Sequence, residues 1–227
     1  MFFDKYYLLL VVPTLILSIY AQFKVKSTFA RFSKEQSKRR ISGAETAKLL
    51  MRTNGITDVS VEAVPGSLTD HYDPAAKKLL LSQSVYAETS IAAIGVAAHE
   101  TGHAIQHATG YGPLALRSYL VPVANIGSAV GPYIAIAGLF FGLPFLLDLG
   151  IVLFAGAVLF YLITLPVEFN ASSRAIAILR SNAVLSDDEL SGVKKVLSAA
   201  AMTYVASALT AVANLLRLVL LARDRRD

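Results

Sequence analysis

Long apolar runs alternate with polar segments along this chain. Residues 6–23 form the first run, and as a helix these eighteen residues would rise about 27 Å, close to the hydrocarbon thickness of a bilayer. Further runs over residues 119–143, 149–167 and 198–222 are also long enough to span a bilayer. The pattern therefore predicts a mainly α integral membrane protein with about four transmembrane helices.

The polar segment after the first run carries shorter elements. Ser42–Glu45 has the Ser-x-x-Glu form of a capping box, so it is predicted to open a helix that ends at Asn54-Gly55. Alternating apolar and polar residues predict a short strand over 58–64, and residues 78–82 predict another. Residues 89–108 predict a longer helix, so a small β element is expected beside the helices.

The first run has two interpretations, a membrane anchor or a cleaved signal peptide. Its start, Met-Phe-Phe-Asp-Lys, carries little positive charge, and no small-x-small cleavage site is evident. The basic residues follow the run instead of preceding it. Residues 1–23 are therefore predicted to be an uncleaved anchor, and the polar residues 24–41 to continue as a basic helix near the membrane surface.

Composition and charge support a membrane location. The chain of 227 residues is 55% hydrophobic and 16% charged, whereas a soluble domain is typically about 25% charged. The excess of positive charge is concentrated directly after the first run, in Lys24, Lys26, Arg31, Lys34, Lys38, Arg39, Arg40, Lys48 and Arg52. A nucleic-acid-binding arm is the alternative, but beside an apolar run such a cluster is typical of a cytoplasmic anchor facing anionic lipid. We expect the lipid bilayer as a partner and no nucleic acid.

The charge bias also predicts a topology. With the N-terminus outside, residues 24–118 lie in the cytoplasm, and the next two spans return residue 168 to the same side. A fourth full span would place the basic tail, with Arg223, Arg225 and Arg226, outside and against the bias. The last run therefore either spans despite these charges or is re-entrant or interfacial, and four spans are favoured.

His99-Glu100-Thr101-Gly102-His103 is the stretch that carries candidate chemistry. On a helix, imidazoles four residues apart lie on one face about 6 Å apart, so both can reach one tetrahedral zinc. Glu100 follows the first ligand and can take a proton from a zinc-bound water. The chain has no cysteine, which excludes thiolate ligands. We predict one Zn2+ per chain, with His99 and His103 as ligands and Glu100 as the general base.

A catalytic zinc normally has three protein ligands, and the third is open between His107, His71 and a carboxylate. His107 lies about 12 Å from His99 along a helix, which argues against shared tetrahedral ligation and favours a supporting or helix-end role. Glu168 is better placed, because it follows the third apolar run on the same predicted membrane face as the histidines. The alternative for Glu168 is a carboxylate at the positive end of a helix.

The motif resembles the bacterial membrane neutral zinc metallopeptidases, the YugP-like family. Besides His99–His107, the resemblance rests on Glu168–Ala175, Asp70–Pro74 and the block Leu79–Ala104, and it covers essentially the whole chain. It implies a zincin-like helical catalytic core in a multi-pass protein of the bacterial cell membrane. By analogy with HtpX-type membrane proteases, Glu168 would be the third zinc ligand. Those relatives usually carry Asp four residues later, where this chain has Ser172, a weaker acceptor for a zinc histidine.

The predicted function is a membrane-embedded zinc endopeptidase that hydrolyses peptide bonds in a protein or peptide substrate, with its active site on the cytoplasmic side. The alternative is a non-catalytic membrane protein, such as a transporter or assembly factor, with a structural zinc site. Glu100 favours the enzyme, because a structural site needs no general base and would be closed by a fourth ligand.

Three supporting roles are expected. Residues 78–82 precede the predicted helix over residues 89–108, which carries the two histidines. They are expected to be either an edge strand that binds the substrate backbone or part of the hydrophobic core. His71, Tyr72 and Arg174 are the candidate oxyanion donors, and Gly102 would serve close packing or metal access.

These predictions divide the chain into five segments. They are an anchor over residues 1–23, a zincin-like catalytic region over 24–118, a transmembrane hairpin over 119–167, a helical segment with the third ligand over 168–197, and an apolar helix with a basic tail over 198–227.

Overall fold

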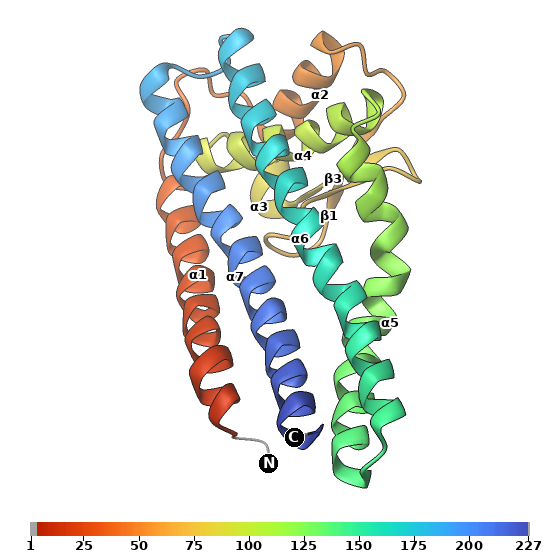
Figure 1. The fold of residues 1–227 in the computed structure, drawn as a ribbon. Helices are drawn as coiled ribbons and strands as arrows, with labels where there is room; N and C mark the ends of the chain where they lie inside the picture. Colours follow the sequence, from red (N-terminus) through yellow and green to blue (C-terminus); the bar gives the residue numbers. More distant parts are fainter. Residues whose placement is uncertain (1–3, 227) are drawn as a thin grey trace. The chain divides into compact units, whose positions relative to one another are not determined.

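The computed structural model describes residues 4–226, and most of them are helical (Figure 1). The elements in chain order are a π-helical turn η1 (Tyr7–Val11), α1 (Val12–Phe32), α2 (Gly43–Thr53), β1 (Ser60–Val64), β2 (His71–Asp73), β3 (Lys78–Ser82), α3 (Gln83–Tyr86), α4 (Ile91–Ala108), α5 (Gly112–Phe141), α6 (Pro144–Ser181) and α7 (Asp187–Arg226).

Four of the described helices are long and apolar enough to cross a membrane. They cover Tyr7–Phe32, Gly112–Phe141, Pro144–Ser181 and Asp187–Arg225. Together with one small sheet, they confirm the prediction of a mainly α-helical membrane protein.

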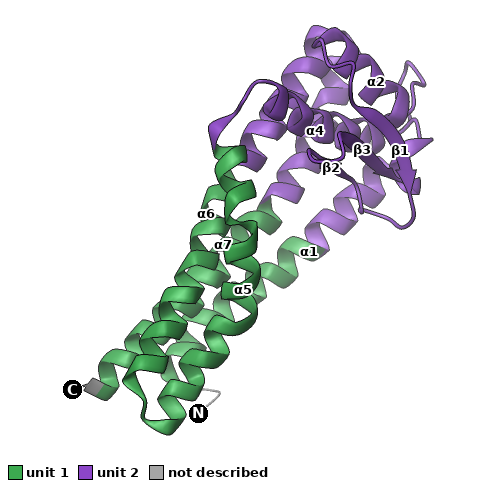
Figure 2. Cartoon of the chain, turned by 90° about the vertical axis from the view of Figure 1, so that its right-hand side faces the viewer, with its two compact units in different colours: residues 1–22, 113–166, 202–227 green, residues 23–112, 167–201 purple. Residues whose placement is uncertain are grey.

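The chain divides into two compact units (Figure 2). The membrane unit comprises residues 1–22, 113–166 and 202–227, and the motif unit comprises residues 23–112 and 167–201. The helices α1, α6 and α7 contribute to both units. In α6 the division falls at Pro166, which has no N–H to donate to the carbonyl four residues earlier and so interrupts the helical hydrogen bonding.

Within the membrane unit, α7 runs antiparallel to the helix formed by η1 and α1. Ser18 Oγ lies 3.2 Å from Thr210 Oγ1 midway along the pair. Towards the chain ends, Arg217 Nη2 donates to Asp4 Oδ2 at 2.6 Å. Because these contacts extend along both helices, the last apolar run lies beside the first over much of its length, which favours a full span over a re-entrant segment.

Within the motif unit, β3 is the central strand of a three-stranded sheet in the order β1-β3-β2. It pairs parallel with β1 and antiparallel with β2. Leu79 and Leu81 on β3 are fully buried. The prediction of a strand over residues 78–82 is therefore confirmed, but its suggested role as a substrate-binding edge is wrong, because both sides of β3 are already paired.

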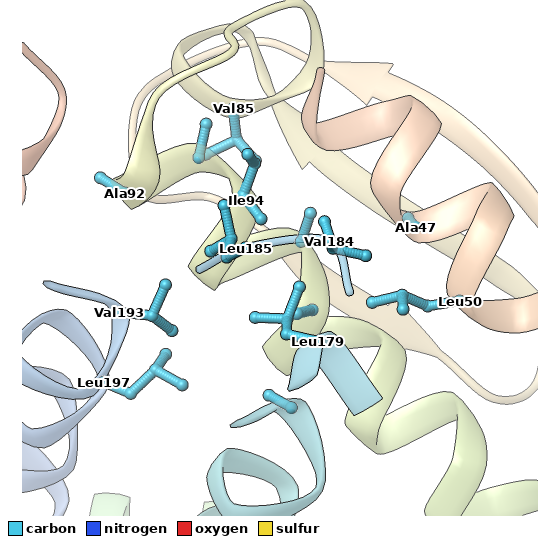
Figure 3. Close-up of a cluster of buried hydrophobic side chains, with 14 of the residues drawn as sticks. Ala47, Leu50, Val85, Ala92, Ile94, Leu179, Val184, Leu185, Val193 and Leu197 are labelled. Carbon is cyan, nitrogen blue, oxygen red and sulfur yellow. The ribbon is translucent and has the colours of Figure 1, made fainter. Parts of the chain in front are cut away.

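The core of the motif unit gathers around α4 (Figure 3). Leu50 of α2, Val85 of α3, Ile94 of α4, Leu179 of α6 and Val193 of α7 are all fully buried there. Helices from distant parts of the sequence therefore hold α4 from several sides.

Residues 24–41 differ from the prediction of one basic surface helix. The helix ends at Phe32, and the following residues bind to other parts of the motif unit. The backbone N–H of Ser37 donates to the carbonyl of Thr89 at 3.0 Å, and that of Lys38 donates to Glu189 Oε1 at 2.7 Å. These tertiary hydrogen bonds replace the helical ones that the local sequence favours.

Candidate metal centre

The helix α4 presents the HExxH motif from a buried position. It begins at Ile91, after the N-cap Ser90, whose side chain accepts from the backbone N–H of Ala93. The predicted start at Thr89 lies two residues too early, because Thr89 instead bonds to Ser37 and Gln36 in the preceding segment. Both faces of the motif are covered, and Thr101 and Gly102 are buried.

Two helices meet at the centre of the motif. A Cβ atom on Gly102 would lie 2.6 Å from the backbone carbonyl oxygen of Ala171 on α6. Only glycine therefore allows α4 and α6 to approach so closely. Glu168 precedes Ala171 by about one helical turn, so the same approach brings its carboxylate to the imidazoles.

Three predicted ligands converge at this crossing. Glu168 Oε2 lies 3.2 Å from His99 Nε2 and 3.5 Å from His103 Nε2. The candidate ligand atoms of the three residues all lie within 4.8 Å of one another. Residues separated by more than sixty positions in sequence thus form one cluster of two imidazole nitrogens and a carboxylate oxygen.

The chemistry and spacing of this cluster fit a zinc ion. Two atoms bonded to a tetrahedral zinc at roughly 2.0–2.1 Å lie about 3.3 Å apart, close to the two separations from Glu168 Oε2. Glu168 is 2% exposed, so a divalent cation would compensate a carboxylate that is otherwise costly to bury. Two histidines and one glutamate also match the donor set of catalytic zinc sites that keep an open position.

The other nitrogen of each imidazole has its own partner. His99 Nδ1 lies 3.2 Å from Ser172 Oγ, and His103 Nδ1 lies 3.0 Å from Gln106 Oε1. The contact of Ser172 is the one expected from its place four residues after Glu168. Gln106 was missed by the sequence analysis, although its position three residues after His103 places it on the neighbouring turn.

Charge around His103 favours its protonated form when no metal is bound. Burial lowers the pKa of His103, but hydrogen bonding with Glu168 and the negative charges of Glu100 and Glu168 outweigh it and raise the pKa above its ordinary value. The same negative charges would favour a bound cation.

Glu100 lies beside this cluster without joining it. It is 8% exposed, and its charge acts on His103, yet the group of possible metal-binding atoms contains only His99, His103 and Glu168. A carboxylate that is close to a metal site but free of the metal can exchange a proton with a water bound there.

The remaining histidines lie outside the cluster. His107 is exposed at the end of α4, and its Nδ1 lies 2.7 Å from Tyr72 Oη on β2. His71 is also exposed, with its Nδ1 2.9 Å from the carbonyl oxygen of Thr69. Neither belongs to the group of possible metal ligands among residues 4–226.

The other two candidate oxyanion donors have different surroundings. Tyr72 is half-buried, and burial together with the charges of Asp58 and Asp73 raises the pKa of its hydroxyl. It therefore stays protonated at neutral pH and can donate a hydrogen bond. Arg174 instead donates from Nε to Asn170 Oδ1 at 2.8 Å.

The helical membrane fold and this cluster together define an integral membrane protein with a candidate His-His-carboxylate metal centre. A family model described as "Putative neutral zinc metallopeptidase" matches residues 7–223. The chain therefore belongs to this family of zinc metallopeptidases, as the sequence resemblance predicted.

A relative carries a similar description. Over 221 residues, the chain is 50% identical to "Putative membrane protease YugP" of Bacillus subtilis (strain 168). The matched region covers 97% of this chain and 98% of that relative. No solved structure matches the chain. The family and the relative's name both support a zinc protease in a membrane.

Proposed function

We propose that this protein is a membrane-embedded endopeptidase that uses one zinc ion bound by His99, His103 and Glu168. The observation that carries this proposal is the pair of separations from Glu168 Oε2 to the two Nε2 atoms, 3.2 Å and 3.5 Å, at a glycine-dependent helix crossing. When bound, the zinc would polarise the scissile carbonyl and lower the pKa of a bound water towards about 7.

Glu100 supplies the general base in this mechanism. Its carboxylate accepts the proton of the attacking water as the new C–O bond forms, and then delivers that proton to the leaving amine as the C–N bond breaks. Its burial strengthens both proton transfers, because few waters compete for the carboxylate.

The substrate is a protein or peptide whose backbone can add to the sheet. β2 ends the strand order, so its outer edge is unpaired among the described strands, and it also contacts α4. An extended peptide could pair along β2 and pass the metal centre. Tyr72, which β2 carries to the last turn of α4, is then the best-placed oxyanion donor.

The proposed location is the bacterial cell membrane, crossed four times, with the motif unit in the cytoplasm. The basic cluster between residues 24 and 52 belongs to that unit and favours the cytoplasmic side. The basic tail, with Arg223 and Arg225, is then outside, against the charge bias.

The test uses the purified full-length chain and a membrane-protein substrate, with cleavage measured before and after zinc removal. The wild type should cleave and should contain one zinc per chain. Glu100→Gln should retain zinc and lose cleavage, whereas His103→Ala should lose both. Full zinc occupancy without cleavage by the wild type or by any variant would instead favour the structural-zinc alternative.

A further inference from the structure

We propose that Gln106 is a positioning residue that fixes the proton of His103 and holds α4 in register with the turn of α6 that carries Glu168. The inference rests on the proposed function, because it concerns how two of the proposed ligands are oriented. Gln106 is fully buried, and both ends of its amide are engaged.

The direction of each hydrogen bond in this network follows from groups that can only donate or only accept. Arg174 Nε can only donate, so the atom of Asn170 that faces it must be the carbonyl oxygen Oδ1. That oxygen also receives a bond from Gln106 Nε2 at 3.0 Å. The nitrogen end of Gln106 is therefore turned towards Asn170, and its oxygen Oε1 must face His103.

A glutamine oxygen can only accept, so His103 Nδ1 must carry the proton. In a neutral imidazole, Nε2 is then the bare nitrogen, and it is the one that lies 3.5 Å from Glu168 Oε2. The network thus selects the tautomer that a metal requires. Ser172 does not select one at His99, since a hydroxyl can either donate or accept.

The same side chain also connects the two helices. Gln106 Nε2 donates to the backbone carbonyl of Val167 at 2.8 Å, one residue before Glu168. A single amide of α4 thereby binds one ligand histidine and the backbone next to the ligand carboxylate. A change at Gln106 should disturb the relative position of both ligands as well as the tautomer.

The test compares Gln106→Leu, Gln106→Glu and Thr101→Val in the full-length protein. Thr101 is a matched control, because it is equally buried in α4 but bonds only to the carbonyl of Ala97. Zinc affinity is measured by chelator competition, and the ring tautomers of metal-free protein by nitrogen NMR of labelled histidine, at a pH high enough for the His103 ring to be neutral. Neither readout depends on activity.

We expect Gln106→Leu to weaken zinc binding roughly 10- to 100-fold and to give His103 a mixture of tautomers. Gln106→Glu keeps an acceptor for His103, so it should restore the single tautomer while zinc binding recovers only in part. Thr101→Val should match the wild type in both. Gln106→Met, which keeps an unbranched side chain of similar length but has no oxygen acceptor, serves as a milder variant if Gln106→Leu does not fold, and should also produce mixed tautomers.

Wild-type zinc affinity and an unchanged His103 tautomer in Gln106→Leu or in the milder variant would overturn the proposal. An equal loss in Thr101→Val would overturn it as well, by showing a general packing effect. Undiminished zinc binding by His103→Ala would overturn the ligand set of the proposed function. This outcome can be distinguished from failure of the Gln106 proposal, because the tautomer measurement does not require zinc.

Discussion

The backbone of Ala171 lies so close to Gly102 that a methyl group at residue 102 would stand 2.6 Å from the Ala171 carbonyl oxygen. Gly102→Ala should therefore push α4 away from α6 and separate the histidines from Glu168. We expect zinc affinity to fall and cleavage to drop by about 100-fold, a loss that a misplacement of about 1 Å at a reacting centre can cause. Equilibrium dialysis with zinc and a cleavage assay test this. Gly112→Ala, where no atom lies near the added methyl, is the control.

Removing the buried carboxylate should abolish the metal site without collapsing the core. In Glu168→Gln the side chain keeps its shape but loses its charge, and we expect zinc content to fall from about one per chain towards zero. Elemental analysis of purified protein measures this. His107→Ala should keep its zinc, since His107 bonds to Tyr72 outside the cluster. The opposite pattern would reassign the third ligand to His107.

Loss of the proposed general base should separate metal binding from catalysis. Glu100→Gln removes the proton acceptor but none of the three clustered ligands, so zinc should remain bound while kcat falls by about 10²- to 10⁴-fold. Steady-state cleavage and zinc content, measured on the same preparation, test the prediction. Full activity in this variant would exclude the proposed mechanism.

Tyr72 should act on the transition state and not on the metal. Tyr72→Phe removes the hydroxyl next to His107, and we expect kcat to fall by about 10²-fold with KM and zinc content unchanged. Stopped assays over a range of substrate concentrations separate kcat from KM. His107→Ala tests whether Tyr72 acts only by holding His107; in that case both variants would show the same loss.

Asp70 should make the motif unit less stable as pH rises. Its carboxylate accepts from the backbone N–H and the hydroxyl of Ser82 at 2.7 Å and 3.0 Å, but burial outweighs these bonds and raises its pKa above 3.8. Because the folded state raises this pKa, it favours the neutral carboxyl group over the charged one. Asp70 therefore stabilises the folded state at low pH, and this contribution to the free energy of unfolding is lost as pH rises through the folded-state pKa. Asp70→Asn should lack this loss. Thermal unfolding in detergent between pH 3 and pH 7 compares the two proteins, and parallel curves would contradict the prediction.

The proposed topology can be tested by labelling, because the natural chain has no cysteine. Arg225→Cys should react with a membrane-impermeant thiol reagent on intact cells, and Lys48→Cys only after the membrane is opened. Both side chains are exposed, so accessibility depends on the side of the membrane. Labelling of Lys48→Cys in intact cells would place the motif unit outside.

The sequence predicted those features that depend on local pattern. Apolar runs revealed the four long helices, because spanning a bilayer demands length and hydrophobicity whatever the neighbours are. The capping box at Ser42 and Glu45 was also correct, since its hydrogen bonds lie within four residues.

The features that depend on distant contacts were not predicted. Nothing in residues 78–82 shows that β3 lies between two strands, because strand order is set by the rest of the sheet. The helix that was expected to reach residue 41 ends at Phe32, since Lys38 meets Glu189 from the other end of the chain. The role of Gln106 could not be recognised from the sequence alone, because it depends on hydrogen bonds to Asn170 and Val167 on α6.

The order of the clustered residues along the chain has a consequence for biosynthesis. A ribosome makes His99 and His103 first, and must then complete α5 and most of α6 before Glu168 emerges. A nascent chain therefore holds only two of the three donor groups until both of these membrane helices exist. In the proposed enzyme, this order would keep an unfinished molecule inactive and would couple the onset of proteolysis to insertion in the bilayer.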